Sequence, residues 1–307
     1  MPIIEANNLV KTYNKGKVLA LDNVSLQINS AEIFGLIGPD GAGKTTLFRI
    51  LTSLIIADTG NAIVHDLDVV KQYRDLRKII GYMPGRFSLY QDLTVEENLQ
   101  FFATLFNTSI KKNYNLIEDI YVQLEPFKNR RAGKLSGGMK QKLALCCALI
   151  HKPKILFLDE PTTGVDPVSR KEFWEMLKRL QQQEITILVS TPYMDEALLC
   201  DKIALMQGGK ILQTDSPSNI IASYPKKLFA VKSDDMFNLL SVLRNYDQVF
   251  SAFSFGDALH ISGKETLSEN DIEQYLTALK YTDVTIQEIE PGIEDCFMQY
   301  MHTSQHA

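Results

Sequence analysis

The chain has 307 residues, of which 45% are hydrophobic and 22% are charged. This length is sufficient for two compact domains, and this composition excludes both a disordered chain and a small scaffold held together by disulfides or metal. The formal net charge of −5 argues against a general nucleic-acid binder, because such proteins present an excess of lysine and arginine to phosphate.

The charge is unevenly distributed along the chain. Residues 226–307 carry 6 basic and 13 acidic side chains, so the acidity lies in the C-terminal part. This asymmetry indicates a boundary near Tyr224 and Pro225. We therefore expect one domain over residues 1–222 and an accessory domain over residues 226–307.

The cysteines and the apolar runs bear on the cellular location. Two of the four cysteines, Cys146 and Cys147, are adjacent, which suits neither a disulfide framework nor metal binding. No apolar run approaches the roughly 18 residues that a membrane helix needs, and the first residues lack the pattern of a secretory signal. The sequence predicts a protein of the reducing cytoplasm.

The N-terminal residues predict short strands at 3–6, 18–20, 24–28 and 33–37, separated by Asn, Gly and Asp. The fourth of these strands is apolar throughout, as a strand buried on both faces should be. A glycine-rich loop follows it, and then a segment with the spacing of a helix. Strand, glycine loop and helix therefore occur in the order that a phosphate site requires.

Two further buried strands are predicted at 155–158 and 185–189, with a helix from Pro167 between them. This alternation predicts an α/β fold whose core is a parallel sheet covered by helices. Residues 73–150 have mostly helical periodicity, and we interpret them as a helical insertion into this core.

The acidic C-terminal part has its own order of predicted strands and helices. We predict strands at 228–231, 249–255, 258–261 and 284–289, helices at 236–243 and 272–279, and a last amphipathic helix at 293–301. The order βαββαβ is typical of a ferredoxin-like α+β unit. We find no catalytic constellation in this part.

The loop after residue 37 matches the P-loop pattern G-x-x-x-x-G-K-[ST]. Its residues are Gly38, Pro39, Asp40, Gly41, Ala42, Gly43, Lys44 and Thr45, and Thr46 follows. Glycines allow backbone N–H groups to surround phosphates, and the following helix points its positive end toward them. Lys44 should reach the β and γ phosphates of a nucleotide, and the Thr45 hydroxyl should bind Mg²⁺.

An acidic pair, Asp159 and Glu160, follows the buried strand at 155–158. Asp159 is placed to hold the Mg²⁺ shell, and Glu160 to polarise an attacking water as the catalytic base. Two carboxylates at a strand end are also common in solvated loops, but the upstream P-loop favours the functional interpretation.

A third element, Ser136, Gly137 and Gly138, leads into a helix and offers a hydroxyl and free N–H groups to phosphate. Between a P-loop and an Asp-Glu pair, it resembles the signature motif of the ATP-binding cassette (ABC) ATPases over residues 1 to about 222. This resemblance implies a P-loop NTPase cassette fold, with an antiparallel β subdomain beside the parallel sheet core and the helical insertion. It implies ATP and Mg²⁺ as cofactors. It also implies that two cassettes face each other head to tail, with the signature residues of one contacting ATP bound by the other.

The resemblance assigns two more positions. Tyr13 stands where the family places an aromatic residue that stacks on adenine. Asp166 lies in a segment that resembles the D-loop, which crosses to the partner cassette. ATP would then hold the dimer together, and a monomer would hydrolyse poorly.

Two positions depart from the family pattern. Gly85 stands in the Q-loop position of a glutamine, and Pro192 stands in the switch position of a histidine. Glycine has no side chain to coordinate a ligand, and proline lacks a backbone N–H. We therefore expect ATP binding to be intact and hydrolysis to be slow. Coupling would pass through neighbours such as Gln91, Ser190 or Thr191.

The segments 193–197 and 291–297 resemble the branch of the family that serves ABC-2 type permeases, many of them exporters. The resemblance implies a motor subunit on the inner face of the membrane, bound to a separately encoded permease and not to nucleic acid. Two alternatives stay open: a weakly hydrolysing regulatory cassette that pairs with another ABC ATPase, and a non-transport ABC protein acting on ribosomes or DNA.

Overall fold

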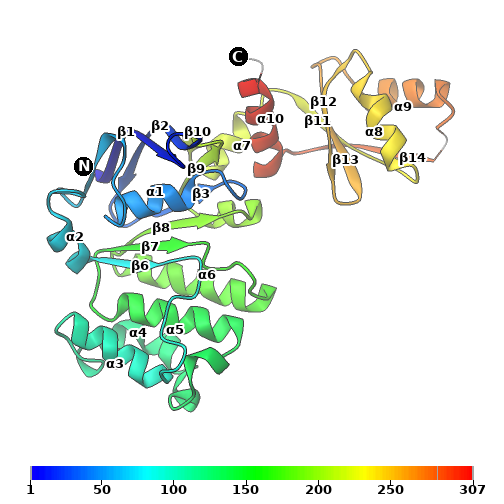
Figure 1. Ribbon diagram of the computed structural model, residues 1–307. Coiled ribbons are helices and arrows are strands. Elements are labelled where there is room, and N and C mark those ends of the chain that lie inside the picture. Colours follow the sequence, from blue (N-terminus) through cyan, green and yellow to red (C-terminus); the bar gives the residue numbers. More distant parts are fainter. Residues whose placement is uncertain (1, 282, 306–307) are drawn as a thin grey trace. The chain divides into compact units, whose positions relative to one another are not determined.

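The apolar run before the glycine loop forms strand β3 (Ile33–Ile37), and all five of its residues are buried. In the structure, a computed structural model that describes residues 2–281 and 283–305, β3 lies inside a six-stranded sheet with the order β10-β9-β3-β8-β7-β6 (Figure 1). The other strands are β6 (Ile80–Met83), β7 (Ile155–Asp159), β8 (Thr186–Thr191), β9 (Lys202–Gln207) and β10 (Lys210–Asp215). All pairs except β9 with β10 are parallel, which confirms the predicted core.

A second, antiparallel sheet has the order β2-β1-β4-β5. Its strands are β1 (Pro2–Tyr13), β2 (Val18–Asn29), β4 (Thr59–Val64) and β5 (Leu67–Asp68). The short strands predicted at 3–6, 18–20 and 24–28 were wrong in length. Both long strands contain an asparagine with positive φ, Asn8 and Asn23, and register shifts on either side of Leu9 let the pairing continue past polar residues.

Helix α1 (Lys44–Leu51) lies between these two sheets. Its buried Leu47, Phe48 and Leu51 belong to one apolar cluster that contains residues of both sheets. The rings of Phe48 and Phe157 meet edge to face, with centroids 5.9 Å apart. The helix that follows the glycine loop is therefore fixed by packing on two sides.

Residues 73–150 contain the predicted helices and one strand. The helices are α2 (Tyr73–Ile79), α3 (Val95–Leu105), α4 (Tyr114–Tyr121) and α5 (Gly137–Leu149), with 3-10 turns at Lys111–Asn113, Glu125–Phe127 and Ala132–Lys134. Figure 1 shows α3, α4 and α5 beyond the β6 edge of the parallel sheet. The prediction of a helical segment is corrected at residues 80–83, because β6 pairs with β7 and belongs to the sheet.

Helix α6 (Pro167–Gln182) begins at a proline behind the cap residue Asp166, and it packs against β3 and β8. A 3-10 helix, η4 (Met194–Leu199), follows β8. The chain divides into two compact units between Pro217 and Ser218, within α7 (Pro217–Ala222). The sequence placed this division slightly later, at 222–226.

The second unit contains a four-stranded antiparallel sheet with the order β12-β13-β11-β14. Its elements are β11 (Lys227–Ser233), α8 (Met236–Arg244), β12 (Val249–Phe255), β13 (Ala258–Gly263), α9 (Glu269–Ala278), β14 (Val284–Ile289) and α10 (Ile293–Gln305). Up to β14 the order is βαββαβ, as in a split βαβ unit. Alternate strand residues such as Phe229 and Ile261 pack against Leu239 of α8 and Ile272 of α9.

Two remaining observations concern the cysteines and the membrane. Cys146, Cys147, Cys200 and Cys296 are all buried and free. Among the described residues, no helix has both the length and the apolar character that crossing a bilayer requires.

Candidate functional site

The glycine loop connects β3 to α1 and is tightly enclosed. Gly41 and Gly43 have φ values of +80° and +107°, which residues with a Cβ rarely adopt. A Cβ on Gly38 would lie 2.1 Å from the Met206 carbonyl oxygen, and one on Gly43 would lie 2.5 Å from that of Ala20. The missing side chains of Gly38 and Gly43 therefore let the loop pack directly on the protein backbone, whereas the Cβ position of Gly41 has no atom within 4 Å. Residues 38–46 form one continuous loop and helix start.

Lys44 extends back along this loop and is only 3% exposed. Its Nζ donates to the carbonyl oxygens of Gly38 at 2.7 Å and Pro39 at 2.9 Å. The same Nζ lies 3.2 Å from Glu160 Oε1. A buried ammonium group with these partners is a strong, directed positive charge beside the loop.

Asp159 ends β7 next to the glycine loop and is 2% exposed. Its Oδ1 accepts hydrogen bonds from Thr45 Oγ1 at 3.2 Å and from Ser190 Oγ at 2.7 Å. Burial and the Asp159 carboxylate raise the pKa of Tyr82 to about 12. The structure thus brings together the P-loop threonine and the strand-end aspartate that the sequence predicted as a pair.

Thr45 and Asp159 fit a divalent cation that arrives with a polyanion. The described residues contain no cluster of three or more His, Cys, Asp or Glu side chains able to hold a metal alone. Mg²⁺ prefers oxygen ligands and is usually held by one or two protein groups together with substrate phosphates and water. The hydroxyl of Thr45 and the carboxylate of Asp159 supply such a pair.

Glu160 follows Asp159 with a φ of +51°, a strained value for a residue with a side chain. Its N–H donates to the Ser190 carbonyl oxygen at 3.1 Å and to Ser190 Oγ at 3.0 Å. The backbone of β8 therefore holds this turn, and the Glu160 side chain stays 23% exposed. Strain of this kind is typical of functional sites.

The three coupling candidates lie in different places. Ser190 contacts both Asp159 and Glu160, as described above. The Thr191 carbonyl oxygen accepts the Gly38 N–H at 3.3 Å, which connects β8 to the glycine loop. The Gln91 carbonyl oxygen instead accepts the Gly133 N–H at 2.9 Å, so its backbone contact is within the helical region.

The degenerate positions and Tyr13 border the same site. A Cβ on Gly85 would lie 3.0 Å from the Asp159 carbonyl oxygen, so this glycine packs directly on the end of β7. Pro192 is partly buried and follows β8. The Tyr13 hydroxyl lies 3.5 Å from Thr46 Oγ1, which places the end of β1 beside the start of α1.

The signature residues do not lie beside Lys44. Ser136 caps α5 by accepting the Met139 N–H at 3.4 Å, and Ser136 and Gly137 are exposed. A Cβ on Gly138 would lie 3.2 Å from Ser169 Oγ, next to the segment that contains Asp166. In Figure 1, α5 lies on the far side of β6, β7 and β8 from α1.

Asp166 serves as the N-cap of α6. Its Oδ1 accepts the Ser169 N–H at 3.0 Å, and this hydrogen bond lowers the pKa of the carboxyl group. The signature segment and the Asp166 loop thus form one exposed surface, separate from the glycine loop of the same chain.

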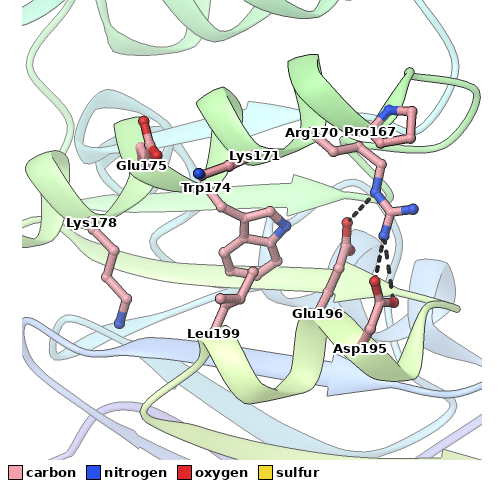
Figure 2. A pocket seen from close by; sticks show the side chains of 9 residues that line it. All are labelled: Pro167, Arg170, Lys171, Trp174, Glu175, Lys178, Asp195, Glu196 and Leu199. Atoms are coloured by element: carbon pink, nitrogen blue, oxygen red, sulfur yellow. Dashed lines mark hydrogen bonds and ion pairs between the residues drawn. The ribbon is translucent and has the colours of Figure 1, made fainter.

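Sequence reasoning missed a second buried carboxylate near the site, Glu196. It is 2% exposed and accepts hydrogen bonds from Thr162 Oγ1 and Arg170 Nε, both at 3.1 Å. Figure 2 shows Arg170 reaching from α6 to Glu196 and to the neighbouring Asp195. The one signal in the sequence was an arginine in the first turns of α6 and an acidic pair after β8, a common pattern on solvated surfaces.

A groove adjoins this cluster. Its volume is about 530 Å³ (Figure 2). The lining includes Trp174, Leu199, Arg170, Asp195 and Glu196. The indole nitrogen of Trp174 has no hydrogen-bond partner although it is buried.

Comparisons with known proteins agree with this geometry. The family model described as "ABC transporter" matches residues 21–163. The chain is 37% identical over 97% of its length to the "Probable multidrug ABC transporter ATP-binding protein YbhF" of Escherichia coli, of which it covers 52%. It is 34% identical to the "Nod factor export ATP-binding protein I" of Rhizobium sp. (strain N33), with 92% of each chain covered. The chain thus spans about half the length of YbhF and nearly all of the Nod factor protein.

Solved structures give the same result for the first unit. CbiO1 from Clostridium perfringens, part of the ABC transporter complex CbiONQ, is 26% identical with a TM-score of 0.64, over 72% of this chain and 91% of that one. A dimeric ATP-binding cassette bound to ADP and Pi is 25% identical with a TM-score of 0.63, over 69% and 98%. The near full-length match to an export ATP-binding protein is decisive, and the chain belongs to the family of ABC transporter ATP-binding proteins.

Proposed function

We propose that this chain binds and hydrolyses ATP as the motor subunit of an ABC-2 type exporter. The observation that carries the proposal is the convergence of Lys44, Thr45, Asp159 and Glu160 around one glycine loop. A buried cation beside free loop N–H groups suits a polyphosphate, and a neighbouring carboxylate suits activation of a water. Family membership supports the same reaction.

Each residue has a definite task in this proposal. The N–H groups of residues 40, 41 and 43–46 and the Lys44 ammonium bind the phosphates, and the Tyr13 ring stacks on the adenine. Thr45 and Asp159 would hold Mg²⁺, which neutralises charge on the phosphates when it is bound. Glu160 orients the attacking water and accepts its proton, with its backbone fixed by Ser190.

Before ATP binds, Lys44 and Glu160 form an ion pair that keeps each side chain from its proposed partner. The ion pair at 3.2 Å holds the Glu160 carboxylate against the lysine. Phosphate oxygens compete for Lys44, and their arrival releases Glu160 toward the water. We expect turnover to be slow, because neither Gly85 nor Pro192 offers a side-chain polar group to the site.

We infer that two cassettes act together head to tail. Ser136, Gly137 and Asp166 form an exposed surface away from Lys44 of their own chain, as a contribution to a partner's site requires. The named relatives are ATP-binding proteins of export systems, and one solved relative is dimeric. A separate permease, bound at the inner face of the membrane, would supply the transport pathway.

Three purified proteins test hydrolysis: the wild type, Glu160→Gln and Pro192→His. We expect the wild type to release phosphate faster than Glu160→Gln, and Pro192→His to be faster still. If the wild type releases phosphate no faster than Glu160→Gln, the proposal that this chain is an active ATPase is wrong.

Mixing two inactive variants tests the shared site. Lys44→Ala removes the cis lysine, and Ser136→Arg blocks the trans surface. In a head-to-tail heterodimer of the two, both defects fall on one ATP site and the other site is intact. We expect a 1:1 mixture to regain up to about a quarter of the wild-type rate, because about half of the randomly formed dimers are heterodimers and each of these has one intact site. Each variant alone should give none. No recovery would contradict the trans arrangement.

A further inference from the structure

The buried Glu196 connects three segments, two of which follow the strands β7 and β8 that end at the ATP site. It lies in η4, four residues after Pro192. Its two carboxylate oxygens accept from Thr162, which follows Glu160 by two residues, and from Arg170, in the first turns of α6 behind the Asp166 loop. One side chain therefore links the turn after β7, the start of α6 and the segment after β8.

Arg170 strengthens this link. Its guanidinium pairs with Glu196 and Asp195, both at 3.1 Å, and lies over the Tyr193 ring at 4.3 Å from the centroid. The pair with Glu196 is shielded, since Glu196 is 2% and Arg170 22% exposed, whereas Asp195 is 75% exposed. Charge-assisted hydrogen bonds in a shielded setting are stronger and more directional than surface ion pairs.

Pro192 makes this link important. The segment after β8 has no donor at Pro192, and Tyr193 N–H donates to Thr191 Oγ1 at 3.1 Å within the segment itself. Long-range polar contacts from residues 193–196 go to Arg170 and Thr162. The hydrogen bond that joins this segment to the turn after Glu160 is therefore the one from Thr162 to Glu196, and Arg170 holds the other oxygen of the same carboxylate.

We infer that Arg170 and Glu196 are positioning residues for ATP hydrolysis, an inference that rests on the proposed function. They hold the segment after β8 and the turn after Glu160 in one fixed relation. Neither touches the phosphate loop through a contact described above, so their loss should slow turnover and leave ATP affinity nearly unchanged.

The test compares neutral double variants. Arg170→Gln with Glu196→Gln removes the charges together and leaves no unpaired buried charge. The matched control is Arg179→Gln with Asp119→Asn, which removes an exposed pair at 3.2 Å between the same helix α6 and α4. We expect kcat to fall at least about tenfold in the first protein and less than about twofold in the control, with KM for ATP within about threefold in both.

Two further measurements separate positioning from folding. Glu196→Gln alone is nearly isosteric, and it should lower kcat while the melting temperature stays close to that of the wild type. Amide hydrogen exchange should become faster in residues 160–165 and 192–197 and stay unchanged in residues 38–46. Arg170→Lys should retain more activity than Arg170→Gln, because it keeps a cation beside Glu196.

The outcomes are distinct. A double variant that turns over like its control, or one whose kcat, ATP affinity and melting temperature fall together, overturns the inference. A wild type no faster than Glu160→Gln overturns the proposed function itself. Slow turnover with normal ATP affinity and locally faster exchange supports both.

Discussion

The two units of the chain differ in the polar side chains that they bury. In the first unit Lys44, Asp159, Ser190 and Glu196 are all at most 3% exposed, and each one has polar partners near the glycine loop or the segment after β8. Within the described part of the second unit, the buried polar side chains are Ser262 and Asp295. Burying charge costs free energy unless it is paired, so the first unit carries the structural expense of a reactive site and the second is built mainly by apolar packing.

The largest expected effect is on the lysine of the glycine loop. Lys44→Ala removes the buried cation and should reduce ATP turnover by about a thousandfold, to the level of Glu160→Gln. Phosphate release measures the turnover, and a fluorescent ATP analogue measures the binding. Lys232→Ala in the second unit removes an exposed lysine paired with Asp257 and should leave both unchanged. Equal losses of ATP turnover in the two variants would contradict the conclusion that the reactive site belongs to the first unit.

The next effect is on stability in the second unit. Phe229 is fully buried in its core, so Phe229→Ala should destabilise that unit by about 3 to 5 kcal/mol. Hydrogen exchange in β11 and β13 measures this loss, and Phe237→Ala, at an 86% exposed position of α8, is the control. ATP affinity should not change. A parallel loss of ATP affinity would reveal that the two units are thermodynamically linked.

A smaller effect is expected at the end of β8. Ser190→Ala removes the donor to Asp159 and one acceptor for the Glu160 N–H, and it should slow turnover about tenfold. Ser190→Thr keeps the hydroxyl group and should stay much closer to the wild type. If both variants were equally slow, crowding and not the hydrogen bond would explain the loss.

The smallest effect is a pH dependence at the surface of the first unit. Hydrogen bonds from the Lys11 and Thr12 side chains and the Thr12 N–H lower the pKa of Asp58 to about 2. Because the folded pKa lies below the unfolded one, the stabilisation is present above about pH 4 and is lost as the pH falls toward 2.

Urea unfolding measures this dependence. The difference in free energy of unfolding between the wild type and Asp58→Asn should be constant above about pH 5 and shrink as the pH falls below about 4. Glu175→Gln, at an exposed position of α6, is the control and should show no such change. A difference independent of pH would mean that the contact does not depend on the charge of Asp58.

The sequence predicted the parts of the fold that local patterns determine. Apolar runs gave β3, β7 and β8, and the strand at Val284–Ile289 matches its prediction at both ends. The glycine loop between β3 and α1 was predicted from its sequence pattern, because its positive φ values and close contacts admit only glycine at Gly38 and Gly43. The strand β6 was missed, since a four-residue apolar segment after a helix has no period long enough to distinguish it.

The sequence motifs of the site could be predicted, but the long-range hydrogen bonds between them could not. The pairing of Asp159 with Thr45 follows from strand order, but the hydrogen bonds of Ser190 depend on the register between β7 and β8. The role of Glu196 depends on Arg170 and Thr162, which are 26 and 34 residues away in sequence. Contacts of this range are set by tertiary packing, which no local pattern encodes.

The tight enclosure of the glycine loop has a mechanical consequence. Gly43 is packed against Ala20 of β2, Gly38 is packed against Met206 of β9, and the Gly209 N–H donates to the Ala42 carbonyl oxygen at 3.0 Å. The loop is therefore a joint that fastens the antiparallel sheet to the parallel one. An added methyl group at Gly43 would push these two sheets apart. The glycine loop, which we propose binds the nucleotide, therefore also stabilises the packing of the two sheets within the first unit.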